Sequence, residues 1–112
     1  MSKSNYQKTI AIDFDGVIHA YREGWKDGTI YDEAVPYAIH SMKKLLARGY
    51  KLVIFTCRAE TEEGANAVYK WLNKYDIDTA LLEVTDRKPK AIAYIDDRGI
   101  RFTNWQDVLN YF

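Results

Sequence analysis

This 112-residue sequence has a single cysteine and no formal net charge. Its one cysteine, Cys57, excludes an internal disulfide and suits a reducing compartment, so a cytoplasmic location is expected. Sixteen basic and sixteen acidic side chains give a formal charge of zero at pH 7. That balance argues against a protein that is attracted to nucleic acid by its bulk charge.

Long apolar runs, internal repeats and low-complexity stretches are also absent. No segment approaches the apolar length that a membrane-spanning helix needs, so no membrane partner is expected. The polar residues 1–8 do not have the pattern of a signal peptide and are interpreted as an N-terminal extension. We therefore expect one domain over residues 1–112, large enough to fold around its own core.

What the sequence does contain is an alternation of apolar strands and amphipathic helices. The apolar residues within 10–14 are typical of a strand buried on both faces. Further strands are predicted at 51–56, 80–84, 91–95 and 101–102, and helices from Pro36 to Gly49, after a Thr61 cap, and after a capping box of Thr103 and Gln106. This order predicts an α/β fold, a three-layer, Rossmann-like parallel sheet of about five strands flanked by helices.

Residues 16–33, which we call the flap, interrupt this alternation. The flap holds three glycines and three aromatic residues among mixed charges, a composition typical of an ordered loop or small hairpin. Its aromatic residues, Tyr21, Trp25 and Tyr31, are expected to pack on the sheet or against a second subunit rather than to stack on a ligand.

Three of the predicted strands end in reactive side chains. Asp13 and Asp15 lie where the first strand runs into a glycine turn, Thr56 ends the second strand, and Asp96 with Asp97 follows the fourth. The carboxyl ends of parallel strands lie on one edge of a sheet, so groups far apart in sequence converge on one crevice. The sequence therefore predicts a site at this edge.

Four converging carboxylates predict a bound cation. Two like charges about 4 Å apart repel by about 4 kcal/mol at an effective dielectric of about 20, so a cation neutralises the carboxylates or some of them stay protonated. Oxygen ligands suit a hard ion, and Mg²⁺ prefers a few carboxylates, retained waters and a substrate phosphate. Thr56 can donate a hydrogen bond to that phosphate, and Lys88 or Lys90 can bring an ammonium group to it.

In their order and spacing these residues resemble the four motifs of the haloacid dehalogenase (HAD) superfamily of phosphatases and phosphotransferases. The motifs are matched in turn by Asp13, Asp15, Gly16 and Val17; by Thr56 at the end of an apolar strand; by Lys88 in a Lys-Pro pair; and by Asp96 and Asp97. The resemblance covers nearly the whole chain, from 9 to 102. Each motif alone is weak, and their joint order and strand-end placement is specific.

The resemblance implies a Mg²⁺-dependent phosphatase. Asp13 would attack phosphorus and form an aspartyl phosphate, while Asp15 would protonate the leaving oxygen and then activate the water that hydrolyses the intermediate. Mg²⁺ would be held by Asp13, the backbone carbonyl of Asp15, and Asp96, with Asp97 binding directly or through water.

The phosphate-binding set follows from the same resemblance. Thr56 and Lys88 would hold the transferred phosphoryl group as charge moves between the attacking and leaving oxygens. Gly16, within the first motif, and Arg58, which follows the second, complete the predicted set, and Lys90 is the alternative to Lys88.

The intervals in which members of the superfamily often carry a cap domain are short here. Only the flap follows the first strand, and the interval from Val84 to Lys88 has almost no room for an insertion. The chain therefore resembles a capless member with an open site. Either a partner subunit of a homo-oligomer closes the site, or the phosphorylated substrate supplies its own cover. That substrate is a small molecule or an accessible phosphate on a macromolecule, and nucleic acid is expected only in this role.

Several of these residues also have structural interpretations. Asp96 and Asp97 alone fit a solvated turn, and Thr56 alone fits the cap of a strand end. Cys57 is interpreted as a buried small hydrophobic residue rather than a nucleophile, because no activating partner is evident.

The basic residues beside the motifs are open to two interpretations. Arg58 and Arg98 fit contacts with a leaving group or second anion, and they fit surface ion pairs with neighbouring carboxylates equally well. His19 and His40 are expected to be structural, since the chemistry needs neither.

Three other functions use similar residues. A phosphoacceptor receiver domain has a parallel α/β fold with an acidic Mg²⁺ site, a Thr and a Lys, although its phosphorylated Asp ends an internal strand where this chain has Thr56. A degenerate member of the fold used only for binding is disfavoured, because every group that the chemistry requires is present. Phosphotransfer to an acceptor other than water shares the first half of the reaction and stays an alternative.

Overall fold

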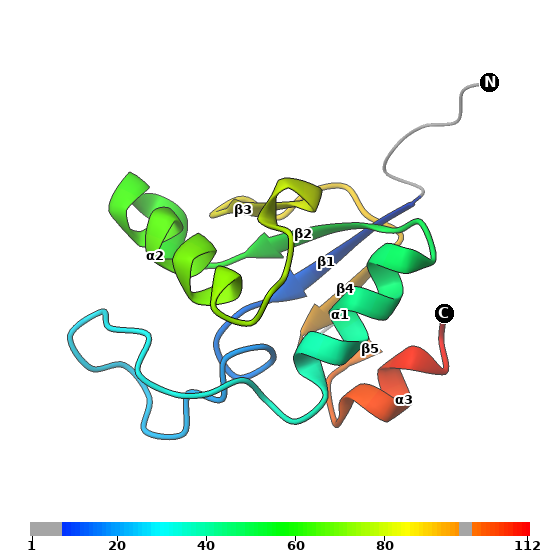
Figure 1. The fold of residues 1–112 in the computed structure, drawn as a ribbon, viewed down its shortest axis with the longest axis horizontal. Helices are drawn as coiled ribbons and strands as arrows, with labels where there is room; N and C mark the ends of the chain where they lie inside the picture. The colour runs from blue at the N-terminus through cyan, green and yellow to red at the C-terminus, as the bar shows by residue number, and fades with distance from the viewer. Residues whose placement is uncertain (1–7, 97–99) are drawn as a thin grey trace.

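The computed structural model describes residues 8–96 and 100–112 and has a parallel sheet at its centre (Figure 1). The strands lie in the order β3-β2-β1-β4-β5, and every neighbouring pair is parallel. They are β1 (Thr9–Asp13), β2 (Lys51–Phe55), β3 (Leu82–Thr85), β4 (Ala93–Asp96) and the two-residue β5 (Ile100–Arg101). The predicted α/β class with a parallel sheet is confirmed.

The described residues form three α-helices beside the sheet: α1 (Ala38–Ala47), α2 (Glu62–Asn73) and α3 (Trp105–Leu109). Two short 3₁₀ helices, η2 (Cys57–Glu60) and η3 (Thr79–Leu81), precede α2 and β3. No helix among the described residues is long and apolar enough to cross a membrane.

The apolar core lies between the helices and one face of the sheet. Alternate residues of β1, Ile10 and Ile12, belong to the same hydrophobic cluster as Met42 of α1, Leu72 of α2 and Trp105 of α3. The predicted third layer would be helices on the other face of the sheet. In residues 8–96 the link from β3 to β4 contains no helix, so this layer is wrong for the part of the chain that is described. The opposite face of β1 is still buried, since Ala11 is 0% exposed.

Two predicted helix starts differ from the structure. Tyr37 has a φ of 66°, whereas residues of a right-handed α-helix have negative φ. The helix α1 therefore begins at Ala38, and Pro36 lies before it. The cap of α3 is Asn104, whose side chain accepts a hydrogen bond from the Asp107 N–H, and the predicted capping box is therefore one residue early. The Thr61 cap of α2 and the glycine stop after α1 are confirmed.

Two strand boundaries also move. Asp78 caps η3 through the N–H of Ala80, so residues 79–81 form a 3₁₀ turn and β3 starts two residues later than predicted. The fourth strand begins at Ala93 rather than at 91. Both shifts occur at the amino ends of the strands, whereas their carboxyl ends, Thr85 and Asp96, each lie one residue beyond the prediction.

The flap is a loop ordered by its own polar contacts. The carbonyl oxygen of Phe14 accepts hydrogen bonds from three successive N–H groups, those of 17–19, which turn the chain out of β1. Farther along, the phenol of Tyr31 donates to the carbonyl of Gly24 and accepts from the N–H of Glu23, both at 2.9 Å. Figure 1 shows the flap extending beyond the arrowhead of β1.

Candidate active site

The carboxyl ends of three neighbouring strands bring the predicted residues to one edge of the sheet. β1 lies between β2 and β4, and Asp13 pairs with Phe55, the residue before Thr56. The register between β1 and β4 continues to bring Asp13 level with Asp96. Neighbouring strands lie about 4.8 Å apart, so Asp13, Thr56 and Asp96 form a row across the middle of the sheet.

This row lies where the chain reverses the direction in which it builds the sheet. From β1 the chain adds β2 and then β3 on one side, whereas β4 returns to the other side of β1. Open α/β sheets bind ligands outside the carboxyl ends of the strands at such a switch point. The flap leaves β1 at the same edge, and so borders the row.

Asp15, two residues past Asp13, is held by two basic partners. The guanidinium of Arg58 donates from Nε to Oδ2 at 3.0 Å and from Nη2 to Oδ1 at 3.1 Å. Nδ1 of His19 lies 2.8 Å from the same Oδ1. The side chains of Arg58 and His19 are 4% and 0% exposed, against 21% for Asp15, so the carboxylate is fixed from the protein side and open toward solvent.

Thr56 is the N-cap of η2. Its Oγ1 accepts a hydrogen bond from the N–H of Arg58 at 3.2 Å, and its own N–H donates to the carbonyl of Thr85 at 2.9 Å. A hydroxyl oxygen that accepts still carries a hydrogen to donate. The strand-end cap and the predicted phosphate donor are therefore compatible roles for one side chain.

Of the two candidate lysines, Lys88 contacts a predicted site carboxylate. Its Nζ lies 3.1 Å from Oδ2 of Asp96, and its ammonium group lies over the rings of Tyr94 and Phe55, 4.5 and 5.4 Å from their centroids. Lys90 is exposed. The ion pair neutralises part of the negative charge that Asp13 and Asp96 bring together.

The metal prediction depends on Asp13, Asp15 and Asp96, because Asp97 lies outside the described residues, as does Arg98. Within 8–96 and 100–112, no three His, Cys, Asp or Glu side chains are close enough together to hold a metal ion. The side chain of Asp15 faces its basic partners, which leaves its backbone carbonyl as the oxygen for a metal. Two carboxylates and a carbonyl still fit Mg²⁺, which commonly binds one or two carboxylates and keeps several waters.

The flap is tied to the site through Asp32. Its carboxylate accepts hydrogen bonds from Nε and the backbone N–H of Arg22, both at 3.0 Å, and these bonds hold the pKa of Asp32 well below its usual range. The carboxylate in turn raises the pKa of Arg22. The backbone of Asp32 donates to Nε2 of His19 at 3.0 Å and accepts from Nε1 of Trp71 at 3.3 Å, so this ordered segment positions the histidine beside Asp15.

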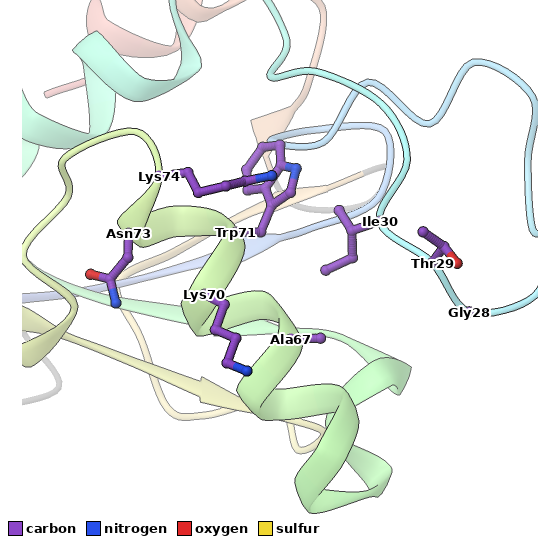
Figure 2. A pocket seen from close by; sticks show the side chains of 8 residues that line it. All are labelled: Gly28, Thr29, Ile30, Ala67, Lys70, Trp71, Asn73 and Lys74. Atoms are coloured by element: carbon purple, nitrogen blue, oxygen red, sulfur yellow. The ribbon is translucent and has the colours of Figure 1, made fainter.

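Two cavities lie along the inner side of the flap. One, of about 520 Å³, is lined by Trp25 and Gly28 of the flap and by Arg58 and Glu63 across from them, so it adjoins the partner of Asp15. The other, of about 590 Å³, lies between the flap and α2. Figure 2 shows the flap residues that line it opposite Trp71 and Lys70 of α2 and Lys74 just after it, and none of the predicted site residues lines it.

Cys57 and Arg58 differ from their sequence interpretations. Cys57 is exposed, so its assignment as a buried hydrophobic residue is wrong. Arg58 is buried, so the alternative of a surface ion pair is wrong as well. The cause is the turn into η2, which directs Thr56 and Arg58 inward and Cys57 outward.

His19 is buried as a structural histidine is, but sequence reasoning missed its contact with Asp15. Its ring packs against those of Phe14, Tyr31 and Trp71 at centroid distances of 5.5, 5.4 and 5.7 Å. The spacing of four residues from Asp15 is the one signal in the sequence. It carries little information in a loop, where such spacing does not fix a contact.

Comparisons with known proteins bear on the fold. No family model and no curated protein matches the chain. Among solved structures, the chain is similar to a conserved protein from Bacteroides thetaiotaomicron, with a TM-score of 0.68 and 24% identity over 91% of this chain and 86% of that one. At this identity the likeness shows a shared fold alone, and the function has to be argued from the site.

Proposed function

We propose that the chain is a capless, HAD-type, Mg²⁺-dependent phosphomonoester hydrolase. The observation that carries this proposal is the row of Asp13, Thr56 and Asp96 on three adjacent strand ends, with Lys88 paired to Asp96 and Asp15 held close by. The row, Lys88 and Asp15 together offer a nucleophile, a hydroxyl donor, an ammonium group and an acid/base catalyst at one edge. These are the groups that phosphoryl transfer through an enzyme carboxylate requires.

The chemistry proceeds in two displacements. Asp13 attacks phosphorus and forms an aspartyl phosphate, and the leaving oxygen departs with a proton from the Asp15 carboxyl group. Water then attacks the aspartyl phosphate and gives its proton to the Asp15 carboxylate, which releases inorganic phosphate and restores both side chains. Thr56 and Lys88 stabilise the phosphoryl oxygens in both steps.

Asp13, Asp96, the Asp15 carbonyl and Asp97 are the residues that would hold Mg²⁺. When bound, the ion neutralises the carboxylates and the phosphate oxygens, which removes repulsion between an anionic nucleophile and an anionic substrate. A cavity adjoins Arg58, the partner of Asp15.

The proposal is tested with purified protein against an aryl phosphate, a panel of phosphorylated metabolites and a 3′-phosphorylated oligonucleotide. We expect phosphate release that requires Mg²⁺, stops with a chelator and returns when excess Mg²⁺ is added. If none of these substrates is hydrolysed, the proposal is overturned. A long-lived phosphoaspartate without turnover would instead support a receiver-like function, and phosphorylated products with added alcohols would show transfer to an acceptor other than water.

The two candidate lysines can be separated by a matched pair of variants. We expect Lys88→Ala to lower kcat/KM by roughly 100-fold, the usual cost of one donor to a transition-state oxyanion. Lys90→Ala should change kcat/KM by less than about 2-fold, because Lys90 is exposed and surface substitutions usually change free energies by no more than about 0.5 kcal/mol. The Lys88–Asp96 pair is only partly exposed, with side chains 44% and 10% accessible, so the free energy of unfolding is measured for both variants alongside their activity. Equal losses of activity would contradict the assignment of Lys88.

A further inference from the structure

Arg58 has a partner on each of its three side-chain nitrogens. Nε and Nη2 bind the two oxygens of Asp15, and Nη1 donates to the carbonyl of Gly28 in the flap at 2.7 Å. The guanidinium also lies 5.1 Å from the ring centroid of Trp25 and 5.9 Å from that of Tyr21. Three of the five N–H donors of the guanidinium are therefore committed to Asp15 and the flap.

His19 holds the same carboxylate from a second direction. Its Nε2 accepts the N–H of Asp32, so the ring proton lies on Nδ1, which donates to Oδ1 of Asp15. Asp15 thus accepts hydrogen bonds from two buried side chains. A carboxylate that accepts hydrogen bonds from two directions is fixed in orientation.

We propose that Arg58, together with His19, is a positioning residue that holds the Asp15 carboxylate for attack of water on the aspartyl phosphate and ties this orientation to the flap. The inference rests on the proposed function and assigns Arg58 to Asp15 rather than to the transferred phosphoryl group. The second displacement depends most on this arrangement, because there Asp15 acts as the base. The first displacement depends on it little when the leaving group is an aryl oxide that departs without a proton.

The proposal therefore predicts a split between kcat and kcat/KM for an aryl phosphate. kcat/KM reports the steps through formation of the aspartyl phosphate, whereas kcat also includes its hydrolysis. In Arg58→Ala we expect kcat to fall by about 10- to 100-fold, part of the 10²–10⁴-fold that a positioned base contributes, with kcat/KM changed by less than about 3-fold. Aryl oxide should appear in a burst close to one equivalent of enzyme, and the aspartyl phosphate should accumulate.

Two further variants keep the test informative if Arg58→Ala folds poorly. Arg58→Lys keeps a buried cation without the two-point contact, and Trp25→Ala removes an exposed ring, 63% accessible, from the guanidinium. Both should lower kcat more than kcat/KM, Trp25→Ala by about 2- to 5-fold. Guanidinium ion added to Arg58→Ala should restore part of kcat, and the exposed Arg48→Ala should match wild type.

The outcomes separate this inference from the function on which it rests. An equal fall of kcat and kcat/KM without a burst would overturn the positioning role and favour phosphate binding by Arg58. A smaller burst with unchanged turnover per active molecule would also overturn it, since that result reports only misfolded protein. If the wild-type protein hydrolyses no phosphate ester and forms no aspartyl phosphate, the proposed function itself fails and this inference fails with it.

Discussion

Replacing Asp13 with Asn is expected to abolish turnover while the protein stays folded. The amide cannot form the aspartyl phosphate, and loss of a nucleophile in a comparable catalytic unit lowers kcat by orders of magnitude, so we expect a fall of roughly 10³-fold or more. The side chain of Asp13 accepts a hydrogen bond from the N–H of Phe14 at 2.8 Å, and the amide oxygen of Asn can accept the same bond. Phosphate release and covalent labelling of the protein from a phosphorylated substrate are the measurements.

A second readout of the same variant does not depend on activity. Mg²⁺ that binds the folded protein at about 100 times its Kd raises the free energy of unfolding by about 2.7 kcal/mol, and Asp13→Asn should lose most of this increase. Asp76→Asn is the matched control: Asp76 is exposed in the turn after α2, and Asn tolerates its φ of 62°. Full activity in Asp13→Asn, or an equal loss in the control, would contradict the nucleophile assignment.

The row of strand-end residues was predictable because its signals are local. An apolar run that ends in Asp13, another that ends in Thr56 and a third that ends in Asp96 mark three strands and their carboxyl ends in one step. Alternating strands and helices imply parallel pairing, and parallel pairing places those ends on one edge. The sheet order then puts the three strands side by side.

The partners of Asp15 were not predictable, because they depend on tertiary contacts. Arg58 lies 43 residues away along the chain, and an isolated arginine is normally assigned to the surface since burial of an unpaired charge is costly. Asp15 offsets that cost here, and only the folded structure shows the pairing. The exposure of Cys57 follows from the same event, because once Thr56 and Arg58 point inward the residue between them points out.

Gly64→Ala is expected to destabilise the fold although it places a better helix former in α2. A Cβ added at Gly64 would lie 1.8 Å from the carbonyl oxygen of Arg58 and 3.1 Å from Oγ1 of Thr61. The closer neighbour is backbone, so η2 has to move away from α2. Alanine gains about 1 kcal/mol of helix propensity over glycine, whereas overpacking typically costs 1–3 kcal/mol and here displaces a whole turn.

The expected net result is a loss of about 2 kcal/mol in the free energy of unfolding, or a Tm lower by roughly 8 °C. Denaturant titration measures it as a lower midpoint with an unchanged slope. Asn66→Ala, an exposed position of the same helix, should be neutral or slightly stabilising and serves as the control. Because the displaced turn carries Arg58, the folded fraction of Gly64→Ala should also show the kcat defect of the Arg58 variants. Wild-type stability in Gly64→Ala would mean that η2 does not pack against α2 as closely as the 1.8 Å approach requires.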